Sequence, residues 1–188
     1  ELRFSVGERT VVLNEKPFGM RDENGGGARV LELERERIAG TFVTPPLGVR
    51  TAGKRSMPYL SWRIGLDERF FGLGEKFNKV ERTSTRATIW SSDTCGSNTT
   101  DMSYKSVPVL FSTAGWGLML HSSYRSFWEI ATFSYTSGSV LSEDPKLDAF
   151  LFFGSSLKQL LHHYTFLTGR PSMPPKWAAS KCVRNTCV

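Results

Sequence analysis

The feature that most constrains the fold is a series of short apolar segments whose side chains alternate with polar ones. The alternation is clearest between Tyr59 and Asp67, where apolar residues occupy every second position: Leu60, Trp62, Ile64 and Leu66. Successive side chains of a β-strand point to opposite faces, so this pattern predicts a strand with one face in a core. Several such segments at short spacing, before a single helical segment, predict an all-β sandwich.

Other strands are predicted from the same pattern. They lie within residues 1–13, 17–20, 29–33, 107–112, 117–121, 132–135 and 149–153. The segments 17–20 and 29–33 are expected to pair as a hairpin, because Asn24-Gly25 between them is typical of tight turns. Two stretches are expected to be loops: residues 40–58, which are rich in proline and glycine, and the polar stretch Asn78–Tyr104.

One segment near the C-terminal end has helical periodicity. Its apolar side chains recur every three or four residues: Leu157, Leu160, Leu161, Tyr164 and Leu167. Ser156 with Gln159 forms a capping box at the start, and Gly169 and Pro171 end the segment. We therefore predict one helix at about 155–168, with its apolar stripe packed on the side or end of the sandwich.

The composition favours one globular domain. A chain of 188 residues that is 39% hydrophobic can bury a sizeable core. The net charge of +6 is spread over both halves without a basic stripe, so nucleic-acid binding is not expected. No apolar run approaches the roughly 18 residues of a membrane span. The three cysteines have no CxxC spacing, so we expect no disulfide framework, metal site or cofactor.

The stretch Phe70–Phe77 is a glycine-rich turn followed by polar residues. Gly72 and Gly74 alternate with large apolar residues, and Glu75 follows at once. Glycine lets the backbone turn tightly or approach another segment closely, so a sharp turn at a strand end is the simplest interpretation. The polar stretch that follows includes Trp90 and Asp93, and long loops on a rigid sheet are where binding residues collect.

Several short motifs occur in a fixed order from Tyr59 to Ala178. They are Phe71-Gly72-Leu73-Gly74-Glu75-Lys76-Phe77, Trp90-Ser91-Ser92-Asp93, Tyr104-Lys105-Ser106-Val107-Pro108-Val109, Gly115-Trp116-Gly117-Leu118, Phe152-Phe153-Gly154, Leu167-Thr168-Gly169-Arg170-Pro171 and Pro174-Pro175-Lys176-Trp177. Each motif alone is commonplace, but their order and spacing are specific. Together they resemble the N-terminal domain of glycoside hydrolase family 31, which contains α-glucosidases and α-xylosidases.

The resemblance implies a galactose-mutarotase-like β-sandwich packed against a (β/α)8 barrel. In that family the barrel performs retaining hydrolysis with an aspartate nucleophile and an aspartate acid/base, two carboxyl groups about 5–5.5 Å apart. The sequence motifs that contain these two aspartates are not present here, so no catalytic residue is assigned. We expect a sandwich domain at 1–170 and, at 171–188, a proline-rich connector toward a barrel absent from this chain. The polar, basic residues 179–187 depart from the family pattern.

The resemblance also implies one substrate-binding residue, Asp93. In relatives the loop after the glycine turn reaches over the barrel mouth, and the matching aspartate hydrogen-bonds hydroxyls of the terminal sugar. A carboxylate suits this role because it accepts hydroxyl hydrogens with charge assistance. The alternative is that Asp93 caps its own loop through Asp93-Thr94. Gly72, Gly74 and Trp90 are expected to support the loop, Trp90 by core packing rather than by sugar stacking.

The remaining polar candidates are weaker. His121, His162 and His163 invite a search for mutarotase-type acid/base catalysis, but surface or helix-end roles are favoured for them. Asn98-Thr99-Thr100 is an N-glycosylation sequon, which would matter only in a secretory compartment. Glu75 is expected to satisfy backbone donors or a neighbouring arginine, not a substrate.

The leading hypothesis is a non-catalytic sandwich domain of an α-glucosidase or α-xylosidase, which shares an α-linked sugar substrate with a barrel domain. Alternatives are a free-standing carbohydrate-binding module, a structural fragment without activity, and a mutarotase. The first residue is Glu1, so we interpret the chain as a mature or excised segment. The compartment and the oligomeric state do not follow from the residues.

Overall fold

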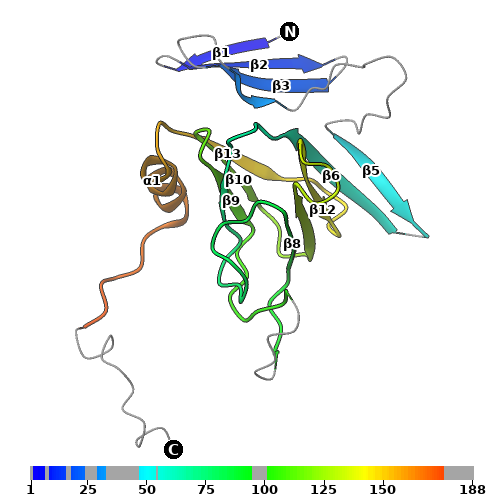
Figure 1. Cartoon of the computed structure of the whole chain (residues 1–188), viewed down its shortest axis with the longest axis vertical. Helices are drawn as coiled ribbons and strands as arrows, with labels where there is room; N and C mark the ends of the chain where they lie inside the picture. Colours follow the sequence, from blue (N-terminus) through cyan, green and yellow to red (C-terminus); the bar gives the residue numbers. More distant parts are fainter. Residues whose placement is uncertain are drawn as a thin grey trace, which may run out of the picture.

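The computed structural model describes residues 2–6, 9–15, 18–23, 29–32, 47–53, 55–94 and 101–175. Their strands form three antiparallel sheets. The first sheet has the order β1-β2-β3-β4 and consists of β1 (Leu2–Val6), β2 (Arg9–Glu15), β3 (Phe18–Glu23) and β4 (Arg29–Glu32). Its β3–β4 pairing confirms the predicted hairpin. In Figure 1 this sheet lies across one end of the other two.

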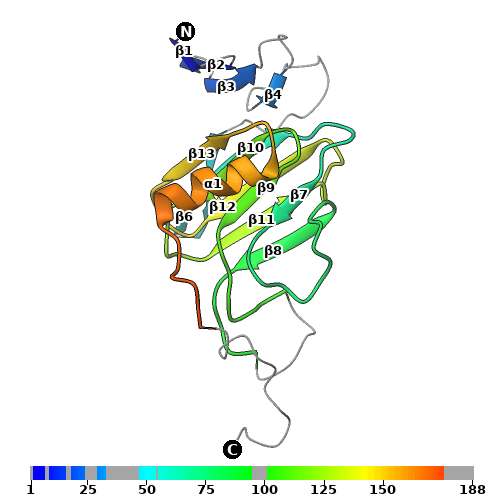
Figure 2. The same cartoon turned by 90° about the vertical axis from the view of Figure 1, so that its left-hand side faces the viewer.

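The other two sheets form the β-sandwich that the alternating segments predict. One has the order β13-β10-β9-β7, with β7 (Phe70–Gly72), β9 (Val109–Ser112), β10 (Trp116–Leu120) and β13 (Ala149–Phe153). The other has the order β5-β6-β12-β11-β8, with β5 (Leu47–Ala52), β6 (Arg55–Arg63), β8 (Thr85–Ile89), β11 (Ser126–Ile130) and β12 (Ser137–Ser142). Figures 1 and 2 show the two sheets face to face.

The core lies between these two sheets and is rich in aromatic side chains. Trp62 and Trp128 come from one sheet, whereas Phe70 and Trp116 come from the other, and all four are buried. The ring centroids of Trp62 and Trp116 are 5.7 Å apart with an edge-on geometry, which aromatic pairs prefer. The alternation of β6 therefore does what the sequence predicts, although Leu66 lies beyond the end of the strand and is fully exposed.

The helix α1 (Leu157–Thr168) has the predicted ends. The Ser156 hydroxyl accepts a hydrogen bond from the Gln159 backbone N–H, and Gly169 follows the last turn. Figure 2 shows α1 across the outer face of the β13-β10-β9-β7 sheet. Leu160 is fully buried there in a second cluster with Val109, Met119 and Phe152. The helix thus packs on the side of the sandwich, which is one of the two positions predicted for it.

The prediction of a loop at residues 40–58 is wrong for its described part. Residues 47–52 form β5, and β6 already begins at Arg55, so this proline-rich stretch contains a hairpin. Pro58 is tolerated because the pairing of β6 with β12 starts only at Tyr59, so no donor is needed from Pro58 on that side. Gly53, with a positive φ of 62°, makes the turn.

Two further predictions are wrong because small residues conceal strands. The strand predicted at 132–135 is a turn, whereas the Ser-Gly-Ser sequence that follows it opens β12. A Cβ atom at Gly138 would lie 2.4 Å from the Trp62 ring, so the large ring requires a small partner opposite it. Similarly, β8 interrupts the loop predicted at Asn78–Tyr104, because Thr85, Ala87 and Ile89 alternate toward the core.

Candidate functional site

The turn after β7 supports the candidate site, because it packs closely against the segment 105–109. Gly72, Leu73 and Gly74 all have positive φ, at 123°, 64° and 75°. Added Cβ atoms would lie 2.3 Å from the Val109 carbonyl oxygen at Gly72 and 2.2 Å from that of Lys105 at Gly74. Glycine is therefore required at both positions for close approach to the segment 105–109, as the sequence suggested. Leu73 is buried and donates its N–H to the Val109 carbonyl at 2.8 Å, which offsets its unusual backbone conformation.

The Arg82 side chain holds this turn from inside. It is only 4% exposed, and its guanidinium donates to the carbonyl oxygens of Gly72 at 3.0 Å and Gly74 at 3.3 Å. It also donates to the Asn78 side chain and the Lys79 carbonyl. Burial lowers the pKa of Arg82, but a guanidinium stays charged at any ordinary pH. The carbonyl contacts of Arg82 therefore fix the direction in which the chain leaves β7.

We call the described residues 90–94 and 101–106 the Asp93 loop. Its two arms meet near the sheet: Ser91 forms a parallel bridge with Ser103, and the Ser92 N–H donates to the Ser103 carbonyl at 3.4 Å. Farther out, the Tyr104 hydroxyl donates to Asp93 Oδ1 at 2.6 Å. The carboxylate of Asp93 thus belongs to an exposed residue and is oriented by a contact from the opposite arm.

Trp90 at the base of the loop is not a core residue. Its side chain is 45% exposed, so the predicted core packing is wrong. The Arg125 guanidinium lies 6.0 Å from the centre of its ring, a cation–π distance, and the Ser106 hydroxyl donates to the Trp90 carbonyl at 3.4 Å. Trp90 therefore has an exposed aromatic surface on the same loop as Asp93.

The other predicted polar residues lie in ordinary surface contacts. Glu75 pairs with Lys105 at 3.1 Å, rather than with an arginine. His121 pairs with Asp148 at 2.8 Å, and His162 Nδ1 lies 2.7 Å from the Arg170 guanidinium. These histidines occupy the surface and helix positions that the sequence favoured. Asn98 and the three cysteines lie outside the described residues.

The described part of the chain contains no group of three or more histidine, cysteine, aspartate or glutamate residues that could hold a metal ion. None of the helices described there is long and apolar enough to cross a membrane.

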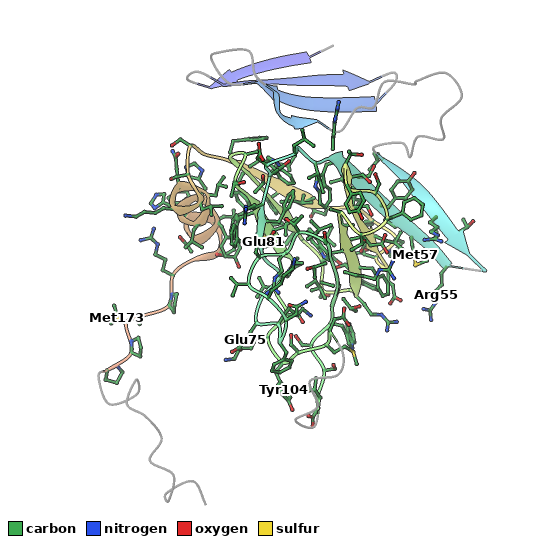
Figure 3. All side chains as sticks on the ribbon, viewed as in Figure 1. Arg55, Met57, Glu75, Glu81, Tyr104 and Met173 are labelled. Carbon is green, nitrogen blue, oxygen red and sulfur yellow. The ribbon has the colours of Figure 1, made fainter. Side chains whose placement is uncertain are left out.

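Figure 3 shows Glu75 and Tyr104 at the end of the sandwich farthest from the β1-β2-β3-β4 sheet, so the polar loops gather at this end.

Sequence reasoning missed Arg82 and Lys76, the two cations that hold the turn and the loop. The Lys76 ammonium donates to the carbonyl oxygens of Thr88 at 2.6 Å and Asp101 at 2.7 Å, and to the Ser106 hydroxyl at 3.2 Å. Most of these acceptors are backbone atoms distant in sequence, and such acceptors leave no pattern in the residue types. Only the place of Lys76 directly after the glycine turn could have drawn attention to it.

The described chain is thus an antiparallel β-sandwich with an aromatic core, a covering helix and an exposed carboxylate on a loop at one end. The chain belongs to the family of glycosyl hydrolase 31 N-terminal galactose mutarotase-like domains, whose family model matches residues 1–129. This membership confirms both the resemblance and the fold class predicted from the sequence.

Individual relatives agree with this assignment. An alpha-xylosidase, XylQ, of Lactiplantibacillus pentosus is 30% identical over 115 residues, which are 61% of this chain and 15% of the relative. Alpha-glucosidase 2 of Bacillus thermoamyloliquefaciens is 25% identical over 95% of this chain and 22% of its own length. The structure of a Flavobacterium johnsoniae GH31 dextranase complexed with glucose matches 94% of this chain with a TM-score of 0.76 at 24% identity. This chain covers 20% of the dextranase chain, so it corresponds to a small part of each of these relatives.

Proposed function

We propose that this chain is the non-catalytic N-terminal sandwich domain of an α-glycosidase of the α-glucosidase or α-xylosidase type. In this proposal residues 1–170 are the sandwich and residues 171–188 are a connector to a (β/α)8 barrel. The barrel carries the two carboxyl groups that break the terminal α-glycosidic bond with retention, and the sandwich contributes a loop to the substrate pocket.

The observation that carries the proposal is the exposed Asp93 carboxylate on a loop with fastened arms. The Tyr104 hydroxyl at 2.6 Å orients this carboxylate before any sugar arrives. A carboxylate accepts hydroxyl hydrogens through charge-assisted hydrogen bonds, and a pair of sugar hydroxyls is a matching donor. An orientation that is fixed in advance lowers the entropy that binding costs. Asp93 is therefore suited to grip the sugar at the non-reducing end.

The course of the chain after the helix supports a barrel beside this loop. Figures 1 and 2 both show the segment that leaves α1 running beyond the strands, and Figure 3, in the view of Figure 1, shows Tyr104 at this same end of the sandwich. This segment contains Pro171, Pro174 and Pro175, and proline-rich chain is stiff and extended. A domain attached to it would approach the sandwich from the end that displays Asp93.

The proposal is tested by steady-state kinetics of the full-length protein that in this proposal contains this domain, with aryl α-glucoside and α-xyloside substrates. Asp93→Ala is expected to lower kcat/KM about 10- to 100-fold, because a lost hydrogen bond to a charged group is worth about 1.5–3 kcal/mol. Asp93→Asn, which keeps one acceptor oxygen, should have a kcat/KM between those of the wild type and Asp93→Ala.

The matched control is Asp148→Ala. Asp148 is also an exposed carboxylate that contacts a side chain, His121 at 2.8 Å, and the proposal gives it no contact with substrate. It should keep kcat/KM within about twofold. An Asp93→Ala enzyme as active as the control would refute the pocket role.

A further inference from the structure

The Lys76 ammonium joins the turn after β7 to two segments that are distant in sequence, β8 and the returning arm of the Asp93 loop. Its acceptors are the Thr88 carbonyl on β8, the Asp101 carbonyl on the returning arm of the Asp93 loop, and the Ser106 hydroxyl at the end of that arm. The distances are 2.6, 2.7 and 3.2 Å. An ammonium has three N–H donors, so these contacts use all of them.

These contacts fix the backbone on both sides of Tyr104. Asp101 lies three residues before Tyr104 and Ser106 two residues after it, and both are bonded to the same ammonium. The Asp101 carboxylate in addition accepts the Thr88 backbone N–H, which fastens the same arm to β8 a second time. The Tyr104 hydroxyl that orients Asp93 therefore extends from an arm held at two points.

Lys76 itself is carried by a rigid turn. Arg82 bonds the carbonyls of Gly72 and Gly74, and the Glu75 N–H donates to the Lys105 carbonyl at 2.9 Å. The turn and the arm thus contact each other through the backbone at Glu75 and through the side chain at Lys76. Movement of the arm would have to break contacts at both residues.

We propose that Lys76 is a positioning residue that acts through Tyr104 to set the Asp93 carboxylate for the sugar. This inference rests on the proposed function for its substrate. Its structural half, that Lys76 holds the returning arm, stands on the contacts alone.

The electrostatics agree with a structural task for this charge. Burial lowers the pKa of Lys76, and the negative charge of Asp101 opposes that shift. Desolvation of an ammonium is unfavourable, and here the carbonyl and hydroxyl acceptors offset it. Loss of the ammonium would leave the Thr88 and Asp101 carbonyls without this donor. Methionine keeps the length and apolar stem of lysine but supplies no donor, so Lys76→Met isolates the contribution of the ammonium.

The test uses the same full-length protein and combines backbone hydrogen exchange with kinetics. In Lys76→Met, exchange of residues 101–106 should accelerate at least about tenfold, while β9 and β10 keep their protection. The KM for the α-glycoside should rise about tenfold with kcat within about twofold, because a displaced loop weakens binding whereas global unfolding would lower kcat. Lys76→Arg should restore part of both properties, and it carries the same test if the methionine variant does not fold.

Two further variants separate the possible outcomes. Lys79→Met removes a more exposed ammonium three residues away and should leave exchange and KM unchanged. In an Asp93→Ala background, Lys76→Met should add no further rise in KM, because residues that act through one contact are not additive. Unchanged exchange in 101–106 would overturn the positioning role, and additive effects on KM would overturn action through Asp93. If exchange is faster in Lys76→Met but Asp93→Ala leaves kcat/KM unchanged, both the proposed function and the substrate half of this inference are overturned.

Discussion

At the residue scale, Glu68 shows how the sandwich accommodates a charge near its core. Glu68 Oε1 accepts hydrogen bonds from the Trp116 indole at 2.8 Å and from the Ser112 hydroxyl, and Oε2 accepts from the Gly65 N–H at 2.8 Å. Burial raises the pKa of this carboxyl, and the three hydrogen bonds oppose the rise. The net shift is upward, so desolvation outweighs the hydrogen bonds.

This shift predicts a pH dependence of stability. Because the pKa of Glu68 is raised above its ordinary value of 4.5, the folded state binds more protons than the unfolded state between these two pKa values. The contribution of Glu68 to the free energy of unfolding therefore falls as the pH rises from 4.5, and it levels off above the folded pKa. Denaturant unfolding of wild type and Glu68→Gln from pH 4 to 8 measures this contribution. A difference that does not change with pH would contradict the shift.

Also at this scale, some residues of the candidate site could be predicted from the sequence and others could not. Asp93, Gly72 and Gly74 could be selected in advance, because a motif order and a turn pattern mark them. Arg82 and Lys76 could not, because their acceptors are largely carbonyl oxygens brought near by the fold. A carbonyl acceptor is present at every position, so residue types carry no information about it.

At the scale of elements, prediction succeeded where local signals decide the structure. The helix α1 begins and ends as expected, because Ser156 and Gly169 are cap residues that act within one turn. The strands β5, β8 and β12 were missed, because pairing with neighbouring strands stabilises them whereas their sequences give weak strand signals. Glycine interrupts β5 and β12, and β8 lies within a largely polar stretch. Tertiary pairing outweighs local preference at these places.

The turn after β7 is the element whose geometry the site depends on most. At Gly74 an alanine would combine a positive φ with a Cβ atom 2.2 Å from the Lys105 carbonyl oxygen, so Gly74→Ala should lower the free energy of unfolding by about 2–4 kcal/mol. At Gly53 the φ is also positive, but no atom lies within 4 Å of the added Cβ. Gly53→Ala should therefore cost only about 1 kcal/mol. Equal losses in urea unfolding would show that close approach is not what requires glycine at position 74.

At the scale of the whole molecule, the sandwich has two distinct ends. The β1-β2-β3-β4 sheet lies across one end, whereas the Asp93 loop and the segment that leaves α1 extend beyond the other (Figures 1 and 2). Family membership fixes the domain type, and the chain is a small part of the relatives compared with it. These features support, without testing, the division of labour that we propose, in which a scaffold presents one oriented carboxylate and a separate domain performs the bond cleavage.

The most direct measurement is a crystal structure of the full-length protein with an α-linked sugar bound at the barrel mouth. We expect a carboxylate oxygen of Asp93 within about 2.5–3.0 Å of a hydroxyl of the terminal sugar, with the Tyr104 contact retained. A bound sugar whose hydroxyls are all satisfied by the barrel, with Asp93 turned away from the pocket, would contradict it.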